Sequence, residues 1–175
     1  MVNGLNQIID QVAKEKSIDR TVLIDALEQA ILSAAKKNFG LEREMEASFN
    51  LETGEIELMM YLVVLPDDEV TSHGRELPLT RATIVDSEVQ LDDELGFQIF
   101  YLDKDRERAE EEDRKYGDIL NIRTARQQFG RIAAMTAKQV IMQRVRDAER
   151  DIVYNEYKDR KAELVTGITR RFERG

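Results

Sequence analysis

The longest uninterrupted helical pattern in the chain lies toward its C-terminal end. Residues 129–161 contain no proline, and their one glycine is Gly130, near the start. Apolar residues recur there at the spacing of one helix face, namely Ala134, Ala137, Ile141, Val145, Ala148 and Ile152. A stripe with this period is buried against other elements in most proteins. The pattern therefore predicts a long C-terminal helix as the largest element of the fold.

The same region has an unusual charge pattern. Residues 119–146 contain no Asp or Glu, although the chain as a whole carries a net charge of -9. They contain six cations, namely Arg123, Arg126, Arg131, Lys138, Arg144 and Arg146. A basic block inside an acidic protein indicates a local anionic partner, and nucleic-acid phosphate is the commonest one.

Composition limits the class of protein. A chain of 175 residues can form one real core. Its longest apolar run, residues 58–65, is too short to span a membrane, and the first residues lack a secretory signal. The absence of cysteine excludes disulfides and thiolate metal sites and fits a reducing compartment. We therefore expect a soluble, cytoplasmic protein.

Two helices are predicted at the start of the chain. Apolar residues at helical spacing over residues 5–12 indicate the first. The second begins after Asp19, which can accept a hydrogen bond from an orphan backbone N–H, and stops at Gly40 in the αL conformation. Lys36 and Lys37 occupy its last turn, where positive charge interacts favourably with the helix dipole. The chain is therefore expected to open with a helical hairpin.

Three strands are predicted next. Residues 44–51 and 55–65 have strand-like composition, and Thr53 and Gly54 form the turn between them, which indicates an antiparallel hairpin. Residues 82–91 alternate in polarity and predict a further strand.

The segment before the long helix is more irregular. Residues 97–102 are interpreted as another strand or as the start of a helix, and residues 104–116 as a solvated helix with i,i+4 ion pairs. Gly117 and Asp118 predict a turn, and residues 119–124 a short strand. The fold class is therefore α+β, with an N-terminal helical hairpin, a mainly antiparallel sheet and a long C-terminal helix.

The sequence contains no recognisable catalytic or metal-binding motif. His73 is the single histidine, and it lies in a loop-like stretch with no partner for nucleophilic catalysis. Asp67, Asp68 and Glu69 lack the spacing of a calcium loop and are more simply explained as solvated loop residues. We predict neither an enzyme, nor a metal site, nor a cofactor.

The basic block has a defined geometry if it is helical. Arg131 and Lys138 are seven residues apart, which places them on one face about 10 Å apart. Met135 and Met142 fall on the same face. The simpler interpretation makes the methionines the edge of the core and the cations solvated flanks. The alternative is a rim where phosphates meet cations beside an adaptable apolar surface.

The basic block has an acidic counterpart. Residues 86–118 contain thirteen Asp or Glu and five Lys or Arg. A solubilising surface is the simpler interpretation. The alternative is a surface that repels RNA and so confines it to the basic side.

Several stretches resemble one known family. Residues 130–150, GRIAAMTAKQVIMQRVRDAER, resemble the signature helix of the N-terminal domain of NusA, the bacterial transcription elongation and termination factor. The second predicted helix, the strand ending in YLVV, the Gly117-Asp118 turn and the closing AELVTGITRR follow in the family's order. Between Val70 and Gly117 this chain has extra residues, including residues 82–91, where the family usually has a short helix.

The resemblance implies a function. It implies docking on bacterial RNA polymerase, on the flap-tip helix of the β subunit beside the RNA exit channel. There the domain stabilises nascent RNA hairpins, lengthens pausing and assists intrinsic termination and antitermination complexes. The resemblance places Lys36, Lys37, Arg131 and Lys138 against the RNA and leaves the polymerase-binding residues unknown.

The resemblance also implies a domain division. Residues 1–161 would form the polymerase-binding domain, and residues 162–175 the start of a truncated OB-fold RNA-binding domain. A single first strand cannot close a barrel, so we expect residues 163–175 to be mobile or to pair with a neighbour.

Two other functions stay open at this point. One is a general RNA-binding or ribosome-associated module without polymerase contact. The other is self-association of the long helix through Met135, Met142 and Val153, although a monomer is favoured.

Overall fold

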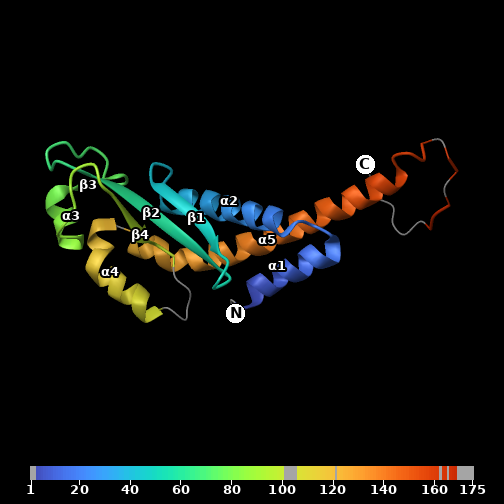
Figure 1. Ribbon diagram of the computed structural model, residues 1–175, viewed down its shortest axis with the longest axis horizontal. Helices are drawn as coiled ribbons and strands as arrows, with labels where there is room; N and C mark the ends of the chain where they lie inside the picture. Colours follow the sequence, from blue (N-terminus) through green and yellow to red (C-terminus); the bar gives the residue numbers. More distant parts are fainter. Residues whose placement is uncertain (1–2, 101–105, 121, 162, 165, 169–175) are drawn as a thin grey trace.

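The computed structural model contains five helices and one sheet among the residues it describes (Figure 1). It describes residues 3–100, 106–120, 122–161, 163, 164 and 166–168, without the side chains of residues 3, 4, 106 and 123–128. The helices are α1 (Asn3–Lys16), α2 (Arg20–Phe39), α3 (Leu79–Val85), α4 (Arg106–Leu120) and α5 (Arg123–Tyr157). The strands are β1 (Glu44–Asn50), β2 (Glu55–Leu65), β3 (Glu76–Pro78) and β4 (Glu94–Gln98).

Strand β2 is the centre of the sheet because all three other strands pair with it. It pairs antiparallel with β1 and β4 and parallel with the short β3. Alternate residues of β2 are buried, namely Ile56, Leu58, Met60, Leu62 and Val64. This alternation gives the sheet one apolar face.

Helices α2 and α5 bring their apolar faces to this sheet and to each other. In Figure 1 both run behind the strands, with α5 along the length of the molecule. The Phe129 ring of α5 is completely buried and lies 5.1 Å from the Phe39 ring of α2 and 5.6 Å from the Phe100 ring, between centroids. The core is therefore a helix pair packed on a sheet, which is the α+β architecture predicted from the sequence.

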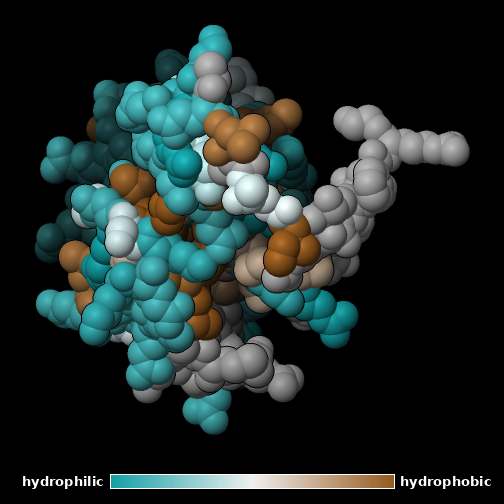
Figure 2. Space-filling view, turned by 90° about the vertical axis from the view of Figure 1, so that its right-hand side faces the viewer, coloured by the Kyte–Doolittle hydropathy of each residue, from teal (hydrophilic) through white to brown (hydrophobic). Residues whose placement is uncertain are grey.

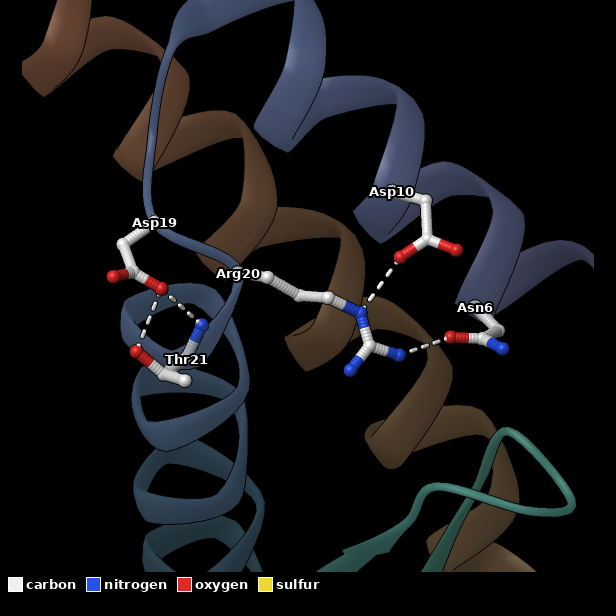
Figure 3. A network of polar contacts seen from close by, with 5 residues as sticks. All are labelled: Asn6, Asp10, Asp19, Arg20 and Thr21. Atoms are coloured by element: carbon white, nitrogen blue, oxygen red, sulfur yellow. Dashed lines mark hydrogen bonds and ion pairs between the residues drawn. The ribbon is translucent and has the colours of Figure 1, made fainter.

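Helix α1 is fastened to the start of α2 by polar contacts (Figure 3). The Arg20 guanidinium donates to Asp10 and to Asn6, each at 2.6 Å, and lies over the Phe49 ring. Asp19 caps α2 as predicted, accepting from the backbone N–H and the hydroxyl of Thr21. The predicted helical hairpin is thus confirmed, with the side chain of Arg20 joining the start of α2 to Asn6 and Asp10 of α1.

Gly54 and Gly40 both have a positive φ. Gly54 has φ 70° in the β1–β2 turn, and a Cβ there would lie 2.9 Å from the Cβ of Asn6. Gly40 ends α2 as predicted, but with φ 127° and ψ 137° it is not in the αL conformation. Its backbone N–H still donates to the carbonyl of Lys36, so the helix ends with that group satisfied.

The sequence prediction for residues 82–91 was wrong. Residues 79–85 form helix α3, and residues 86–91 form no strand. Asp67 starts this helix from across the preceding loop, accepting from the backbone N–H and the hydroxyl of Thr80. Ala82 is the residue that α3 buries. The alternating pattern misled because a seven-residue helix has too few turns to show its own period.

The junction before the long helix also differs from the prediction. Gly117 and Asp118 lie inside α4 instead of forming a turn. No strand occurs in the described part of residues 119–124, because α4 continues to Leu120 and α5 begins at Arg123. The predicted charged helix is confirmed as α4 from residue 106 onward. Strand β4 ends at Gln98, and residues 101 and 102 of the predicted 97–102 element lie outside the described residues.

Helix α5 is longer than predicted, and its buried stripe is different. It starts six residues earlier than Phe129, and its buried side chains are Phe129, Ala133, Ala137 and Ile141. Ala134 and Ile152 of the predicted stripe are exposed. The distal part of α5 extends past the sheet (Figure 1), so its apolar residues have no core to enter. Viewed from that end, the surface is mainly hydrophilic with scattered apolar groups (Figure 2).

The tail after α5 forms no strand in its described residues. Leu164 and Ile168, from the predicted strand pattern, are 96% and 91% exposed. Residues 169–175 lie outside the described part of the chain.

Candidate nucleic-acid interface

The packing of α2 on α5 brings together two segments without carboxylates. The helices run antiparallel, because Phe39 at the end of α2 meets Phe129 near the start of α5. Residues 29–41, which include the second half of α2, contain no Asp or Glu, like residues 119–146. The two segments therefore form one surface without acidic side chains of their own, in a chain whose net charge is -9.

The four predicted RNA-binding residues all lie on these two segments. Lys37, Arg131 and Lys138 are exposed, and Lys36 is half-buried. Within the described residues, none of the four forms an ion pair with a carboxylate. The side chains of Arg123 and Arg126 lie outside the described residues. The structure thus leaves at least three cations of this surface directed at solvent.

The methionines of α5 lie in solvent and not at the edge of the core. Met135 is 66% exposed and Met142 is 46% exposed. Helical spacing places them on the face that also carries Arg131 and Lys138. The simpler interpretation of these methionines, as core residues, was therefore wrong, because the core-facing side of α5 is the one centred on Ala133 and Ala137.

A groove of about 380 Å³ lies between the two helices. Helix α2 lines it with Ala30, Ser33, Ala34, Lys37 and Asn38. Helix α5 lines it with Ile132 and Thr136, which are one turn apart. Its wall is mainly apolar, with hydroxyl and amide groups and one lysine. Sequence reasoning missed this groove because it depends on how the two helices pack.

Arg43 fixes the end of α2 that carries the two lysines. Its guanidinium donates to the carbonyl of Phe39 at 2.8 Å, to the carbonyl of Leu120 at 3.1 Å and to the sulfur of Met60 at 3.4 Å. Burial lowers the pKa of this guanidinium. One cation therefore satisfies the C-terminal carbonyls of two helices, α2 and α4, where a positive charge also interacts favourably with both dipoles.

The acidic residues 86–118 belong to a different part of the fold. Strand β4 and helices α3 and α4 lie together at one end of the molecule, opposite the end from which α5 projects (Figure 1). Within α4, the Glu111–Lys115 pair is 2.7 Å long, and its hydrogen bond lowers the pKa of Glu111. The acidic segment therefore lies at the end of the molecule where α5 begins (Figure 1), and its Phe100 packs against Phe129 of α5.

The polar residues of the segment between β2 and α3 do not form a catalytic site. Two of its carboxylates have structural roles. Asp67 caps α3, and Glu76 accepts the backbone N–H groups of Thr71 and Ser72, which lowers the pKa of its carboxyl. His73 is exposed. Among the described residues, no cluster of three or more His, Asp or Glu could hold a metal ion. In the same residues, no helix is long and apolar enough to cross a membrane.

Comparison with known protein families gives a clear match. The family model described as "NusA N-terminal domain" matches residues 4–111 and 101–151. A transcription termination/antitermination protein NusA from Rickettsia conorii is 35% identical over 169 residues, covering 97% of this chain and 28% of the relative. Its counterpart from Bacillus subtilis is 34% identical over 173 residues, covering 99% of this chain and 39% of the relative. The chain thus spans well under half the length of these relatives.

A solved structure has the same arrangement. The solution structure of the N-terminal domain of NusA from Bacillus subtilis aligns with a TM-score of 0.57 and 31% sequence identity. The alignment covers 86% of this chain and 99% of that one. The predicted α+β fold and the resemblance found in the sequence are both confirmed.

Proposed function

The chain belongs to the NusA N-terminal domain family, and we propose that it is a non-catalytic transcription module that docks on bacterial RNA polymerase. The docking point would be the flap tip of the β subunit, beside the RNA exit channel. There the domain would stabilise nascent RNA hairpins and so promote pausing, intrinsic termination and antitermination complexes. Relatives named transcription termination/antitermination proteins support this role.

The observation that carries the proposal is the carboxylate-free surface formed by residues 29–41 and 119–146. We propose that Lys36, Lys37, Arg131 and Lys138 contact the phosphates of the exiting RNA. The exposure of Lys37, Arg131 and Lys138 supports this, since a phosphate can reach them without any rearrangement of the fold. Few phosphates would be neutralised, so binding to RNA alone should be weak and should fall steeply with salt.

The domain division is part of the same proposal. Residues 1–161 would be the polymerase-binding domain, and residues 162–175 the first part of an OB-fold RNA-binding domain. The module would act in the cytoplasm as a monomer. The high exposure of Leu164 and Ile168 fits a segment whose partners lie outside residues 1–161.

The test is the lifetime of a hairpin-stabilised pause by bacterial RNA polymerase. We expect the chain to lengthen the pause and the Arg131→Glu, Lys138→Glu double variant to lose this effect. The matched control is Lys14→Glu, Lys161→Glu, which changes the net charge equally at two exposed lysines on other segments. The control should lengthen the pause as the wild type does.

Two results would contradict the proposal. If the chain does not bind core polymerase in a pull-down, the polymerase part is wrong, and a general RNA-binding or ribosome-associated module becomes the better account. If both double variants reduce the pause equally, net charge matters and the α5 surface does not.

One observation favours self-association as a second candidate. Met135, Met142 and Val153 are each at least 46% exposed and recur on one side of α5. Light scattering across concentrations tests this directly, since a monomer at all concentrations excludes pairing through that face.

A further inference from the structure

We infer that the groove between α2 and α5 accepts an unpaired nucleobase of the RNA whose phosphates lie on the surrounding cations. This inference rests on the proposed function, because it adds a base-binding site to the phosphate contacts proposed above. The groove overlaps those contacts at Lys37, and the other three predicted RNA-binding residues do not line it.

The size and the wall of the groove fit a base. The groove is open to solvent, and its volume of about 380 Å³ is enough for the ring of one base. Ala30, Ala34 and Ile132 supply apolar surface for the ring faces. The hydroxyl groups of Ser33 and Thr136 offer donors and acceptors for base edges in single-stranded RNA.

The charge around the groove selects the class of ligand. An apolar groove can also take a side chain of a protein partner. This groove, however, has Lys37 in its wall and lies between two segments that together contain no carboxylate and eight cations, so its occupant should be anionic around an apolar group. The nearest carboxylates along the chain are at the segment borders, namely Glu28, Glu42, Asp118 and Asp147. A nucleotide combines one flat, largely apolar base with a phosphate, so RNA meets both requirements.

Lys37 gives the base an orientation, because it lines the groove on the α2 side. Arg131 and Lys138 lie about 100° and 120° around α5 from the groove residue Ile132, on the face that carries Met135. One phosphate of the inserted nucleotide would therefore meet Lys37, and the next phosphates along the strand would meet the cations of α5. A base held in a regular duplex is stacked and cannot enter, so the site would favour loops over stems.

The experiment compares two RNA hairpins with the same stem and the same number of phosphates. One has a loop of ordinary nucleotides, and the other has abasic nucleotides in the loop. At low ionic strength we expect the wild-type chain to bind the first about 5-fold more tightly, the low end of what a stacked base contributes, because no aromatic side chain lines the groove. The abasic hairpin measures the phosphate contacts alone.

The groove is filled by Ser33→Leu together with Thr136→Leu, which changes no charge. We expect this variant to bind both hairpins with the affinity that the wild type shows for the abasic one. The control is Gln29→Leu together with Ala134→Leu, one exposed position on each helix that does not line the groove. It should retain the wild-type preference. Circular dichroism checks that both variants are folded.

Crosslinking of the unmodified chain gives an independent measurement. A 4-thiouridine in the loop should crosslink to residues 30–38 or 132–136. Crosslinks confined to other segments would contradict the inference even if the filled variant did not fold.

The outcomes separate this inference from the proposed function. Equal wild-type affinity for the two hairpins overturns the base site and leaves the phosphate contacts standing. If Arg131→Glu, Lys138→Glu does not weaken binding to the abasic hairpin, or if neither hairpin binds, the phosphate contacts themselves are wrong. If the filled variant keeps its loop preference but binds core polymerase more weakly, the groove takes a protein side chain instead.

Discussion

The α2–α5 pair and the acidic end of the molecule, residues 79–120, are built in different ways. The pair buries large side chains, and Phe129 of α5 packs against the rings of Phe39 in α2 and of Phe100. The acidic end consists of the short helix α3, the five-residue strand β4 and the charged helix α4. The region that would hold RNA is therefore packed around larger buried side chains than the region that would repel RNA. We expect the first region to be the more rigid of the two.

The largest expected effect is on the helix pair. Phe129→Ala removes a completely buried ring at the contact between α2 and α5, so the free energy of unfolding should fall by about 3–5 kcal/mol. Denaturant titration measures this. Met135→Ala, on the exposed face of the same helix, should change it by no more than about 0.5 kcal/mol. A loss below about 1 kcal/mol at Phe129 would show that the pair is not the rigid region.

The next effect concerns the residue that joins the two regions. Arg43→Met leaves the carbonyls of Phe39 and Leu120 without their donor, which should cost about 1–3 kcal/mol. Arg150→Met, at an exposed arginine of α5, is the matched control and should be nearly neutral. If Arg43→Met is equally neutral in thermal unfolding, the ends of α2 and α4 do not depend on this cation.

A smaller effect tests whether the acidic segment repels RNA. Glu88 and Glu107 are exposed, and replacing both with lysine should raise the affinity for a hairpin RNA by a few-fold at low salt. The gain should vanish at high salt, because these charges act through solvent. Titration by fluorescence anisotropy at several salt concentrations checks both points. An unchanged affinity at low salt would leave the segment as a solubilising surface only.

The smallest effect compares two capping carboxylates, one in each region. Asp19 caps α2 and Asp67 caps α3, and hydrogen bonds from Thr21 and Thr80 lower the pKa of each carboxyl. A lowered folded-state pKa means that the stabilisation is complete above the unfolded-state pKa and is lost as the pH falls through the folded-state pKa. Asp19→Ala should therefore lower the Tm slightly at neutral pH and have no effect at strongly acidic pH.

The counterpart at α3 should act locally. Asp67→Ala should speed amide hydrogen exchange in α3 and leave the global Tm nearly unchanged, because α3 is a seven-residue helix that buries Ala82 alone. An equal drop in Tm for the two variants would show that α3 unfolds together with the helix pair and is not an independent, weaker element.

The same two regions differ in how well the sequence predicted them. The start and end of α2 followed from Asp19 and Gly40, because a cap and a stop signal act over a few neighbouring residues. The β1–β2 hairpin followed from the turn at Gly54 in the same way. In contrast, α3 depends on Asp67, twelve residues before Leu79 where the helix begins, and on burial of Ala82. No local pattern records such a contact.

The candidate site shows the same limit. Arg131 and Lys138 could be placed on one face of α5 by counting residues, and the structure leaves both exposed. The second carboxylate-free segment, residues 29–41, can be found in the sequence. Only the fold shows that it lies beside α5 and extends the same surface. The groove and the role of Arg43 require the packing of separate elements, so the sequence alone could not predict them.

The length of α5 has a consequence for whatever follows it in the chain. The helix has 35 residues and would extend about 52 Å, with its distal part beyond the sheet. Along such a rod, each residue advances the chain by about 1.5 Å and turns it by about 100°. Inserting one residue between Arg150 and Tyr157 would therefore leave the RNA-facing surface intact while swinging the next segment to a different side. The number of residues in the distal part of α5, more than their identity, sets the direction in which the chain continues.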